Sequence, residues 1–274
     1  NTTTKNPGSH SMNKLFLQRG LVPAIGIIST VFIYSATAVA ATEKKEPWQL
    51  AEETEVWEPV PAVISVPASG VPSDATVLFD GKNLSQWQGA EGGEAKWKVA
   101  DGTLTVVPKT GDIKTKESFC DVQLHVEWKT PTLITDEKGK LLESQGRNNS
   151  GVFLQERYEV QMLDSYNNKT YPNGQAGSIY KQSIPLVNAS RAPGEWQTYD
   201  IIFTAPKFDS AQKLTSPGYV TVLHNGVLVQ NHFEIQGATE WIGKPVYKAH
   251  GCAPIRLQDH GNAMNFRNIW VRKL

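Results

Sequence analysis

Polar and apolar residues alternate along several short segments of the chain. The run Tyr158-Glu159-Val160-Gln161-Met162-Leu163-Asp164 shows the alternation and ends in a carboxylate. Successive side chains of a strand point to opposite faces, so Glu159 and Gln161 share one face, while Tyr158, Val160 and Met162 share the other. Segments 122–128 and 198–203 alternate in the same way, and 269–271 supplies a short closing strand. The pattern predicts strands with one polar sheet face, which we expect to line a wet surface.

Turn residues separate these segments. Asp101-Gly102 lies between the strand-like segments 97–99 and 104–106, and Asn225-Gly226 lies between 219–223 and 227–229. Both dipeptides are typical of tight hairpin turns. The sequence shows no repeat, no glycine-rich phosphate loop and no long amphipathic helix. We therefore predict an all-β fold, a sandwich of two packed antiparallel sheets.

The segment 12–40 has the pattern of a secretory signal peptide. Lys14 and Arg19 form a basic head, an uncharged apolar run spans 21–36, and small residues end at Ala40. An uncleaved membrane anchor is the alternative, because the run approaches the roughly 20 residues that span a bilayer. The small residues favour cleavage near Ala40. We expect a secreted or periplasmic protein with no stable membrane insertion after cleavage.

The sequence predicts three further regions. Residues 1–11 are polar, precede a plausible start methionine, and are expected to be an extension or a misassigned start. Residues 41–74 form a lead rich in Pro and Glu, which we expect to be extended because the prolines break any long helix. Trp48 and Trp57 are costly to leave in water, which favours a strap on the domain surface over a free linker. Residues 75–274 form the sandwich domain.

Composition describes an ordinary globular chain. Of its 274 residues, 39% are apolar and 9% aromatic, enough to bury a sizeable core. Basic and acidic residues both number 27, but three basic and no acidic residues precede residue 41, so the remainder carries about three excess negative charges. Nucleic acid selects strongly basic surfaces, so we expect no nucleic-acid partner.

Two cysteines, Cys120 and Cys252, are present. In an oxidising compartment they pair if their Cα atoms come within about 7 Å. The alternative is two buried small apolar residues. The sequence leaves both open, but two distant cysteines do not make a zinc site.

Several separated motifs carry a resemblance to a known family. They are Tyr158 to Asp164, Asn148 to Phe153, Leu257 to Gly261, Phe266 to Ile269, Leu78 to Gly81, Trp87, and Gly194 to Trp196. Together they resemble the bacterial 3-keto-disaccharide hydrolase family, in order, over roughly residues 75 to 274. The resemblance implies a concanavalin A-like jelly roll that acts on sugars already oxidised to a ketone at C3.

The polar sheet face is the candidate site. On it we place Glu127, Glu159, Gln161, Gln258 and His260, with Asp164 brought round by a strand end or a bulge. We expect Arg147, Asn149 and Tyr180 on rim loops. Mixed amides, carboxylates and aromatic rings suit a sugar, whose hydroxyls need donors and acceptors. The expected partner is an oligosaccharide or glycoside substrate.

The spacing Glu159-x-Gln161-x-x-Asp164 is similar to the ExDxxE strand of retaining jelly-roll glycoside hydrolases. Those enzymes need a carboxylate nucleophile and a carboxylic acid about 5 to 5.5 Å apart. Gln161 cannot ionise, which disfavours ordinary retaining hydrolysis, although Glu127 could restore a carboxylate pair.

A C3 ketone permits elimination instead, because the C2 proton becomes acidic and the glycosidic oxygen at C1 can leave. The reaction needs a base, a donor at the C3 oxygen and an acid for the leaving group. From residue type, the base is Glu159 or His260, the oxyanion partner is Arg267 or a bound divalent cation, and the leaving-group acid is Asp164 or Glu127. Plain alternatives are an ion pair for Arg267, a turn for His260 and a solvated strand position for Glu127.

Two matters stay open at this level. The jelly-roll fold also serves lectins, so a carbohydrate-binding module without turnover is the alternative function. No cofactor is assigned from the sequence. One divalent cation with oxygen ligands is a candidate, although the chain contains no diagnostic metal-binding loop.

Overall fold

The computed structural model describes residues 44–68 and 70–274. The predicted signal peptide and the extension before it lie outside the described residues. The chain divides into two compact units, Asn1–Val60 and Pro61–Leu274. Among the described residues, no helix is long and apolar enough to cross a membrane.

The described part of the first unit contains one short helix, α1 (Pro47–Glu52). A proline occupies its first turn, and the Gln49 side chain accepts a hydrogen bond from the Glu46 N–H at 2.9 Å. The lead is therefore not extended throughout. A proline in the first turn of a helix is tolerated, whereas a proline in the helix interior is not. The side chains of Trp48 and Trp57 are 60% and 78% exposed. Packing of the lead against the sandwich stays a prediction.

The second unit holds the larger, eight-stranded antiparallel sheet. Its order is β13-β12-β9-β6-β15-β4-β3, and β1 pairs with β15 outside this path. The strands are β1 (Thr76–Phe79), β3 (Lys98–Ala100), β4 (Thr103–Thr105), β6 (Val122–Lys129), β9 (Gln197–Thr204), β12 (Tyr219–His224), β13 (Val227–Glu234) and β15 (Asn265–Lys273). The two predicted hairpins are confirmed as β3–β4 and β12–β13.

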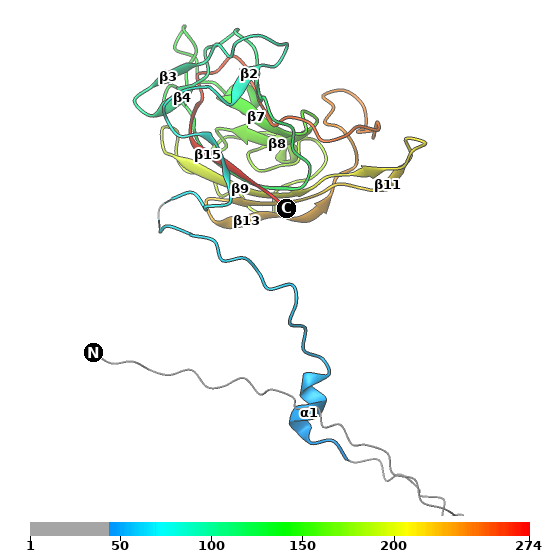
Figure 1. The fold of residues 1–274 in the computed structure, drawn as a ribbon. Helices are drawn as coiled ribbons and strands as arrows, with labels where there is room; N and C mark the ends of the chain where they lie inside the picture. The colour runs from blue at the N-terminus through cyan, green and yellow to red at the C-terminus, as the bar shows by residue number, and fades with distance from the viewer. Residues whose placement is uncertain (1–43, 69) are drawn as a thin grey trace, which may run out of the picture. The chain divides into compact units, whose positions relative to one another are not determined.

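The smaller sheet has five strands in the order β2-β5-β14-β7-β8. They are β2 (Trp87–Gly89), β5 (Ile113–Thr115), β7 (Asn149–Leu154), β8 (Tyr158–Leu163) and β14 (Arg256–Leu257). Two 3-10 turns, η1 (Ser144–Gly146) and η2 (Pro172–Gly174), and a hairpin of β10 (Lys207–Phe208) and β11 (Leu214–Ser216) complete the described elements. Figure 1 shows the two sheets as layers of one sandwich, with the β10–β11 hairpin projecting from it.

The core lies between the two sheets. From the larger sheet, β6 buries alternate residues, including Leu124 and Trp128. From the smaller sheet, Val160 and Met162 of β8 face them. The predicted sandwich and the predicted division of the β8 faces are therefore confirmed.

The pairing register of the smaller sheet determines which side chains lie side by side on its outer face, away from the core. Glu159 of β8 lies opposite Phe153 of β7, which lies opposite Arg256 of β14. Arg256 lies opposite Lys114 of β5, and Lys114 lies opposite Gln88 of β2. Directly opposed residues share a sheet face, so these five side chains form one row across the sheet.

A disulfide joins Cys120 to Cys252 across 4.6 Å between their Cα atoms. It lies beside the bridge between Phe119 and Ala253, which ties the start of β6 to the segment before β14. Both cysteines are exposed, so the alternative of two buried thiols is wrong.

Candidate active site

A cavity of about 640 Å³ opens on the outer face of the five-stranded sheet. Six residues predicted for the site line it: Glu159, Gln161, Asn149, Tyr180, Gln258 and His260. Six further residues complete the lining: Gln145, Gly146, Phe153, Tyr171, Thr239 and Trp241. The cavity therefore joins β7, β8 and the end of β14 with three loops.

Glu159 is the buried ionisable side chain of the cavity, at 5% exposure. Burial raises the pKa of its carboxyl to about 8, against the charge of Arg256, which lowers it, while Asp112 raises it further. A Cβ at Gly151 would come within 2.4 Å of the Glu159 Oε1 atom, so the carboxyl lies directly over this glycine. No hydrogen bond from the described residues reaches the Glu159 carboxyl. It is therefore placed by packing and remains free for a ligand.

A row of side-chain amides forms the cavity floor beside Glu159. Gln161 Nε2 donates to Asn149 Oδ1 at 2.9 Å, and Asn149 Nδ2 donates to the Gln145 carbonyl at 3.0 Å. Gln145 Nε2 in turn donates to the Gly174 carbonyl at 2.8 Å. The prediction that Asn149 lies on a rim loop is wrong, because β7 begins at Asn149. The preceding turn ends at Asn148, and the strand places the Asn149 side chain on the cavity floor. The chain of amides fixes which way each one points.

Tyr180 reaches the cavity from a loop that runs along β8. The Tyr180 N–H donates to the Glu159 carbonyl at 3.2 Å, and the Tyr180 hydroxyl lies 2.7 Å from the Tyr171 hydroxyl. Burial, the Tyr171 hydroxyl and the nearby Glu159 charge all raise the Tyr180 pKa above its ordinary value. The phenol therefore stays protonated and can donate at neutral pH.

Gln258 and His260 enter from the segment that follows β14. The Gln258 N–H donates to the Gly151 carbonyl at 3.0 Å, which extends the strand pairing. The Gln258 Oε1 atom is buried without a hydrogen-bond partner among the described residues. His260 is exposed at the cavity mouth and lies within the turn that Asp259 caps by accepting the Gly261 N–H at 2.9 Å. This segment thus adds a second unpaired acceptor, beside the Glu159 carboxyl, and a solvent-facing imidazole to the described part of the cavity.

Two lining residues that sequence reasoning missed supply apolar surface. Trp241 is 73% exposed, and Phe153 lies in the same row as Glu159. Thr239, also missed, accepts the Glu159 N–H at 3.0 Å and docks its loop on β8. A tryptophan outside the expected strands was the available sequence signal, because a sugar stacks its C–H face on such rings.

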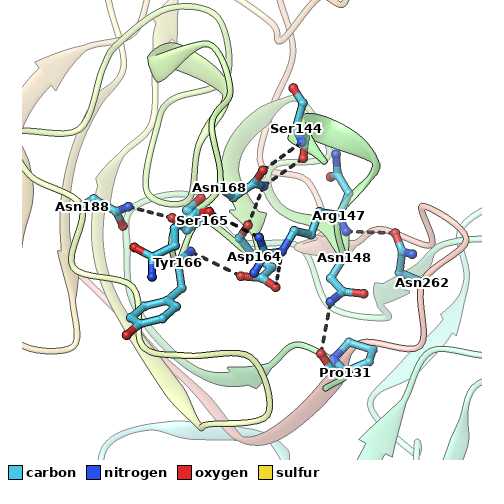
Figure 2. Close-up of polar contacts among 12 residues, drawn as sticks. Pro131, Ser144, Arg147, Asn148, Asp164, Ser165, Tyr166, Asn168, Asn188 and Asn262 are labelled. Carbon is cyan, nitrogen blue, oxygen red and sulfur yellow. Dashed lines mark hydrogen bonds and ion pairs between the residues drawn. The ribbon is translucent and has the colours of Figure 1, made fainter. Parts of the chain in front are cut away.

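Asp164 and Arg147 do not line the cavity. Arg147 Nε donates to Asp164 Oδ2 at 2.9 Å, and the Asp164 carboxylate is 1% exposed. Asn168 Nδ2 donates to the carbonyls of Asp164 and Ser144, which joins the two loops (Figure 2). Burial raises the pKa of Asp164, although Arg147 opposes it. The pairing of β7 with β8 has no bulge, and β8 ends at Leu163, so strand alternation turns Asp164 away from Glu159 and Gln161. The expectation that a strand end or a bulge brings Asp164 to their face is therefore wrong.

Glu127 and Arg267 lie on the other sheet, which corrects the placement of Glu127 on the polar face and the expected role of Arg267 at the C3 oxygen. Glu127 of β6 lies opposite Arg267 of β15, and Arg267 Nε donates to Glu127 Oε2 at 2.6 Å. Asn268 Nδ2 donates to Glu127 Oε1 at 2.8 Å. Burial alone would raise the Glu127 pKa, but the bonds from Asn268 and Arg267 lower it. Val126 and Trp128 of β6 face the core, so strand alternation places Glu127 on the outer face of the larger sheet. Neither Glu127 nor Arg267 can therefore act on a ligand in the cavity.

No three His, Cys, Asp or Glu side chains converge on a common point within the described part of the chain. In the cavity, a cation would have Glu159, His260 and the unpaired Gln258 Oε1 as ligands. The divalent cation stays a prediction, which activity during a chelator titration tests.

The sandwich is a concanavalin A-like jelly roll, and its cavity combines side-chain amides and a carboxyl with aromatic rings. The chain belongs to the 3-keto-disaccharide hydrolase family, whose model is described as a 3-keto-alpha-glucoside-1,2-lyase-like domain and matches residues 74–272.

Solved structures agree with this membership. A candidate glycosyl hydrolase from Parabacteroides distasonis ATCC 8503 is 55% identical, with a TM-score of 0.77 over 81% of this chain and 96% of the other. A second candidate glycosyl hydrolase from that organism is 23% identical, with a TM-score of 0.53 over 73% of this chain and 94% of the other, and shows the shared fold. No curated protein sequence matches the chain. Family and fold together support an enzyme that acts on glycosides.

Proposed function

We propose that this protein cleaves 3-keto-glycosides or 3-keto-disaccharides by removing the C2 proton and eliminating the glycosidic oxygen, followed by hydration. The observation that supports this proposal is the buried Glu159 carboxyl, which receives no hydrogen bond from the described residues and lies in a cavity lined by amides and phenols. The family supports the glycoside class, and its description supports the ketone at C3.

The reaction balances in two stages. Glu159 takes the C2 proton, the electron pair of the C2–H bond becomes the C1=C2 double bond, and the C1–O bond breaks toward the leaving oxygen. The leaving oxygen takes a proton and departs as an alcohol. Water then adds to C1 while C2 regains a proton, which gives net hydrolysis. One residue that gives back the proton it took can serve both stages.

Burial makes Glu159 a stronger base than an ordinary carboxylate. A pKa near 8 in place of 4.5 means that the carboxylate binds a proton about three orders of magnitude more tightly. About a tenth of the free enzyme then carries the ionised base at pH 7. Turnover should therefore rise with pH up to about 8.

The other roles fall to residues of the same cavity. The hydroxyls of Tyr180 and Tyr171 replace Arg267 as donors for the developing C3 oxyanion. His260 at the mouth replaces Asp164 and Glu127 as proton donor to the leaving oxygen. The imidazole is exposed, so water reaches it between turnovers.

The experiment measures loss of deuterium from C2 of a 3-keto glucoside. Glu159→Gln should lower both deuterium loss and turnover by at least about 100-fold, since a general base contributes about 10² to 10⁴. The rise of kcat/KM toward pH 8 should disappear with it. Full exchange in this variant, or a wild-type rate that falls between pH 7 and 9, overturns the assignment.

Glu127→Gln is the matched control. It makes the same chemical change on the other sheet, outside the cavity, so turnover should equal that of the wild type. A similar loss in this variant would mean that Glu159→Gln acts through folding.

We also propose that the protein is exported. The signal-like segment 12–40 supports this, and so does the disulfide, because such bonds persist in oxidising compartments. N-terminal sequencing of the protein recovered outside the cytoplasm should find a new terminus near Ala41. An intact segment in all fractions contradicts the proposal.

A further inference from the structure

A second cavity, of about 630 Å³, opens on the same five-stranded sheet. Its lining is Gly89, Ala90, Glu91, Gly92, Glu94, Lys96, Thr110, Gly111, Asp112, Glu156 and Arg256. Asp112 and Arg256 stand next to Ile113 and Leu257, both of which point into the core. Strand alternation therefore turns Asp112 and Arg256 to the sheet face that carries Glu159.

One stacked pair separates the two cavities. The Arg256 guanidinium lies 3.7 Å from the ring centre of Phe153, with Phe153 lining the first cavity and Arg256 the second. Asp112 forms an ion pair with Arg256, and the Glu156 carbonyl accepts from Arg256 Nη2 at 3.3 Å. The boundary between the two cavities is therefore the Arg256 side chain, which these contacts hold in place on the sheet face that both cavities share.

The shared floor is longer than one sugar ring. Glu159 on β8 and Arg256 on β14 are two strand spacings apart, which is about 10 Å, and Phe153 on β7 lies between them. A ligand with its reacting ring over Glu159 can place a second ring against Arg256, at the edge of the second cavity.

The lining of the second cavity differs in chemistry from the first. Glu91, Glu94 and Glu156 offer acceptors, while Lys96 offers donors, and no aromatic side chain is among the described lining residues. Both signs of charge are present, with acidic groups in excess, which disfavours an anionic ligand. Interspersed donors and acceptors suit a neutral group with many hydroxyls.

We propose that this second cavity is the subsite for the leaving group, and that the group it selects is a second sugar rather than an aromatic aglycone. The inference rests on the proposed function, because it assigns the departing half of the same substrate. Binding in this subsite orients the C1–O bond over Glu159, so contacts there favour disaccharides over simple glycosides.

The experiment compares a 3-keto-disaccharide with a methyl 3-keto-glucoside, which has no group to fill the second cavity. The variant is Glu94→Gln with Lys96→Met; both residues are exposed on a loop between strands. It should lower kcat/KM for the disaccharide about tenfold or more, the effect of one or two lost charged hydrogen bonds, and leave the methyl glycoside unchanged.

Lys98→Met is the matched control, because Lys98 is exposed on β3 and lines neither cavity. It should change neither rate constant. Equal effects of the double variant on both substrates, or no effect on either, overturn the leaving-group subsite alone. No turnover of either substrate by the wild type overturns the proposed function and this inference together.

Discussion

The site at the residue scale depends on a glycine under a carboxyl. Gly151 leaves open the space that the Glu159 carboxyl occupies, because a Cβ there would approach Oε1 to 2.4 Å. The position of the proposed base, Glu159, therefore depends on Gly151, which has no side chain that could take part in the reaction.

Gly151→Ala should displace the Glu159 carboxyl and lower kcat by about 100-fold, since a misplacement of 1 Å can have that effect. The measurement is kcat together with the thermal unfolding midpoint. Gly251→Ala is the control, because a Cβ at Gly251 meets open space. Normal turnover by a folded Gly151→Ala variant would contradict the positioning role.

The raised pKa of Glu159 also makes stability depend on pH. Between pH 4.5 and 8 the folded chain keeps a proton that the unfolded chain releases, so the free energy of unfolding falls as pH rises through this window. Relative to the wild type, Glu159→Gln should gain about 2–4 kcal/mol between pH 4.5 and 8. Urea unfolding at both pH values measures this, and a constant difference would show that the carboxyl is not held neutral.

Sequence reasoning reached Glu159 and Gln161 because strand parity is local. The same alternation rule places Asp164 on the opposite face from Glu159 and Gln161. The prediction for Asp164 was wrong because it assumed that a strand end or a bulge would bring Asp164 to the face of Glu159. Glu127 and Arg267 have suitable chemistry, but which sheet a strand joins depends on distant pairing that residue type does not reveal.

At the scale of elements, the Arg147–Asp164 pair joins the chain after η1 to the end of β8 (Figure 2). Asp164 also receives the Tyr166 N–H at 3.3 Å. These bonds hold the two loops that frame one side of the cavity.

Asp164→Asn should lower the free energy of unfolding by about 3 kcal/mol, because it leaves the Arg147 charge buried without its partner. Folded protein assayed well below its unfolding temperature should keep most of its turnover. Asp80→Asn, which removes an exposed partner of Lys82, should leave the denaturation midpoint unchanged. A stable but inactive Asp164→Asn variant would return Asp164 to a catalytic role.

Long strands with regular alternation were predictable, as β6, β9 and β12 show. The short strands β2, β5 and β14 were not, because two or three residues carry no periodicity. These short strands form the half of the sheet that carries Arg256 and the second cavity. The second cavity could therefore not be predicted from the pattern of polar and apolar residues.

At the scale of the molecule, the disulfide closes a separation of 132 residues that includes β6 to β13. Cys120→Ser with Cys252→Ser should lower the free energy of unfolding by about 3–5 kcal/mol, because the unfolded chain regains the freedom that the cross-link removes. Equilibrium unfolding without reductant measures this. The wild type in strong reductant should match the double variant, and equal stability of all three would contradict a structural role.

The exposed Trp241 at the cavity mouth gives the protein a built-in optical reporter. A sugar that covers this indole would move it from water to an apolar contact and shift its emission to shorter wavelength. Trp87 and Trp128 are already shielded in the core and would contribute a constant background. Ligand affinity could thus be followed by fluorescence with no attached dye, and replacement of Trp241 by Phe would silence the signal.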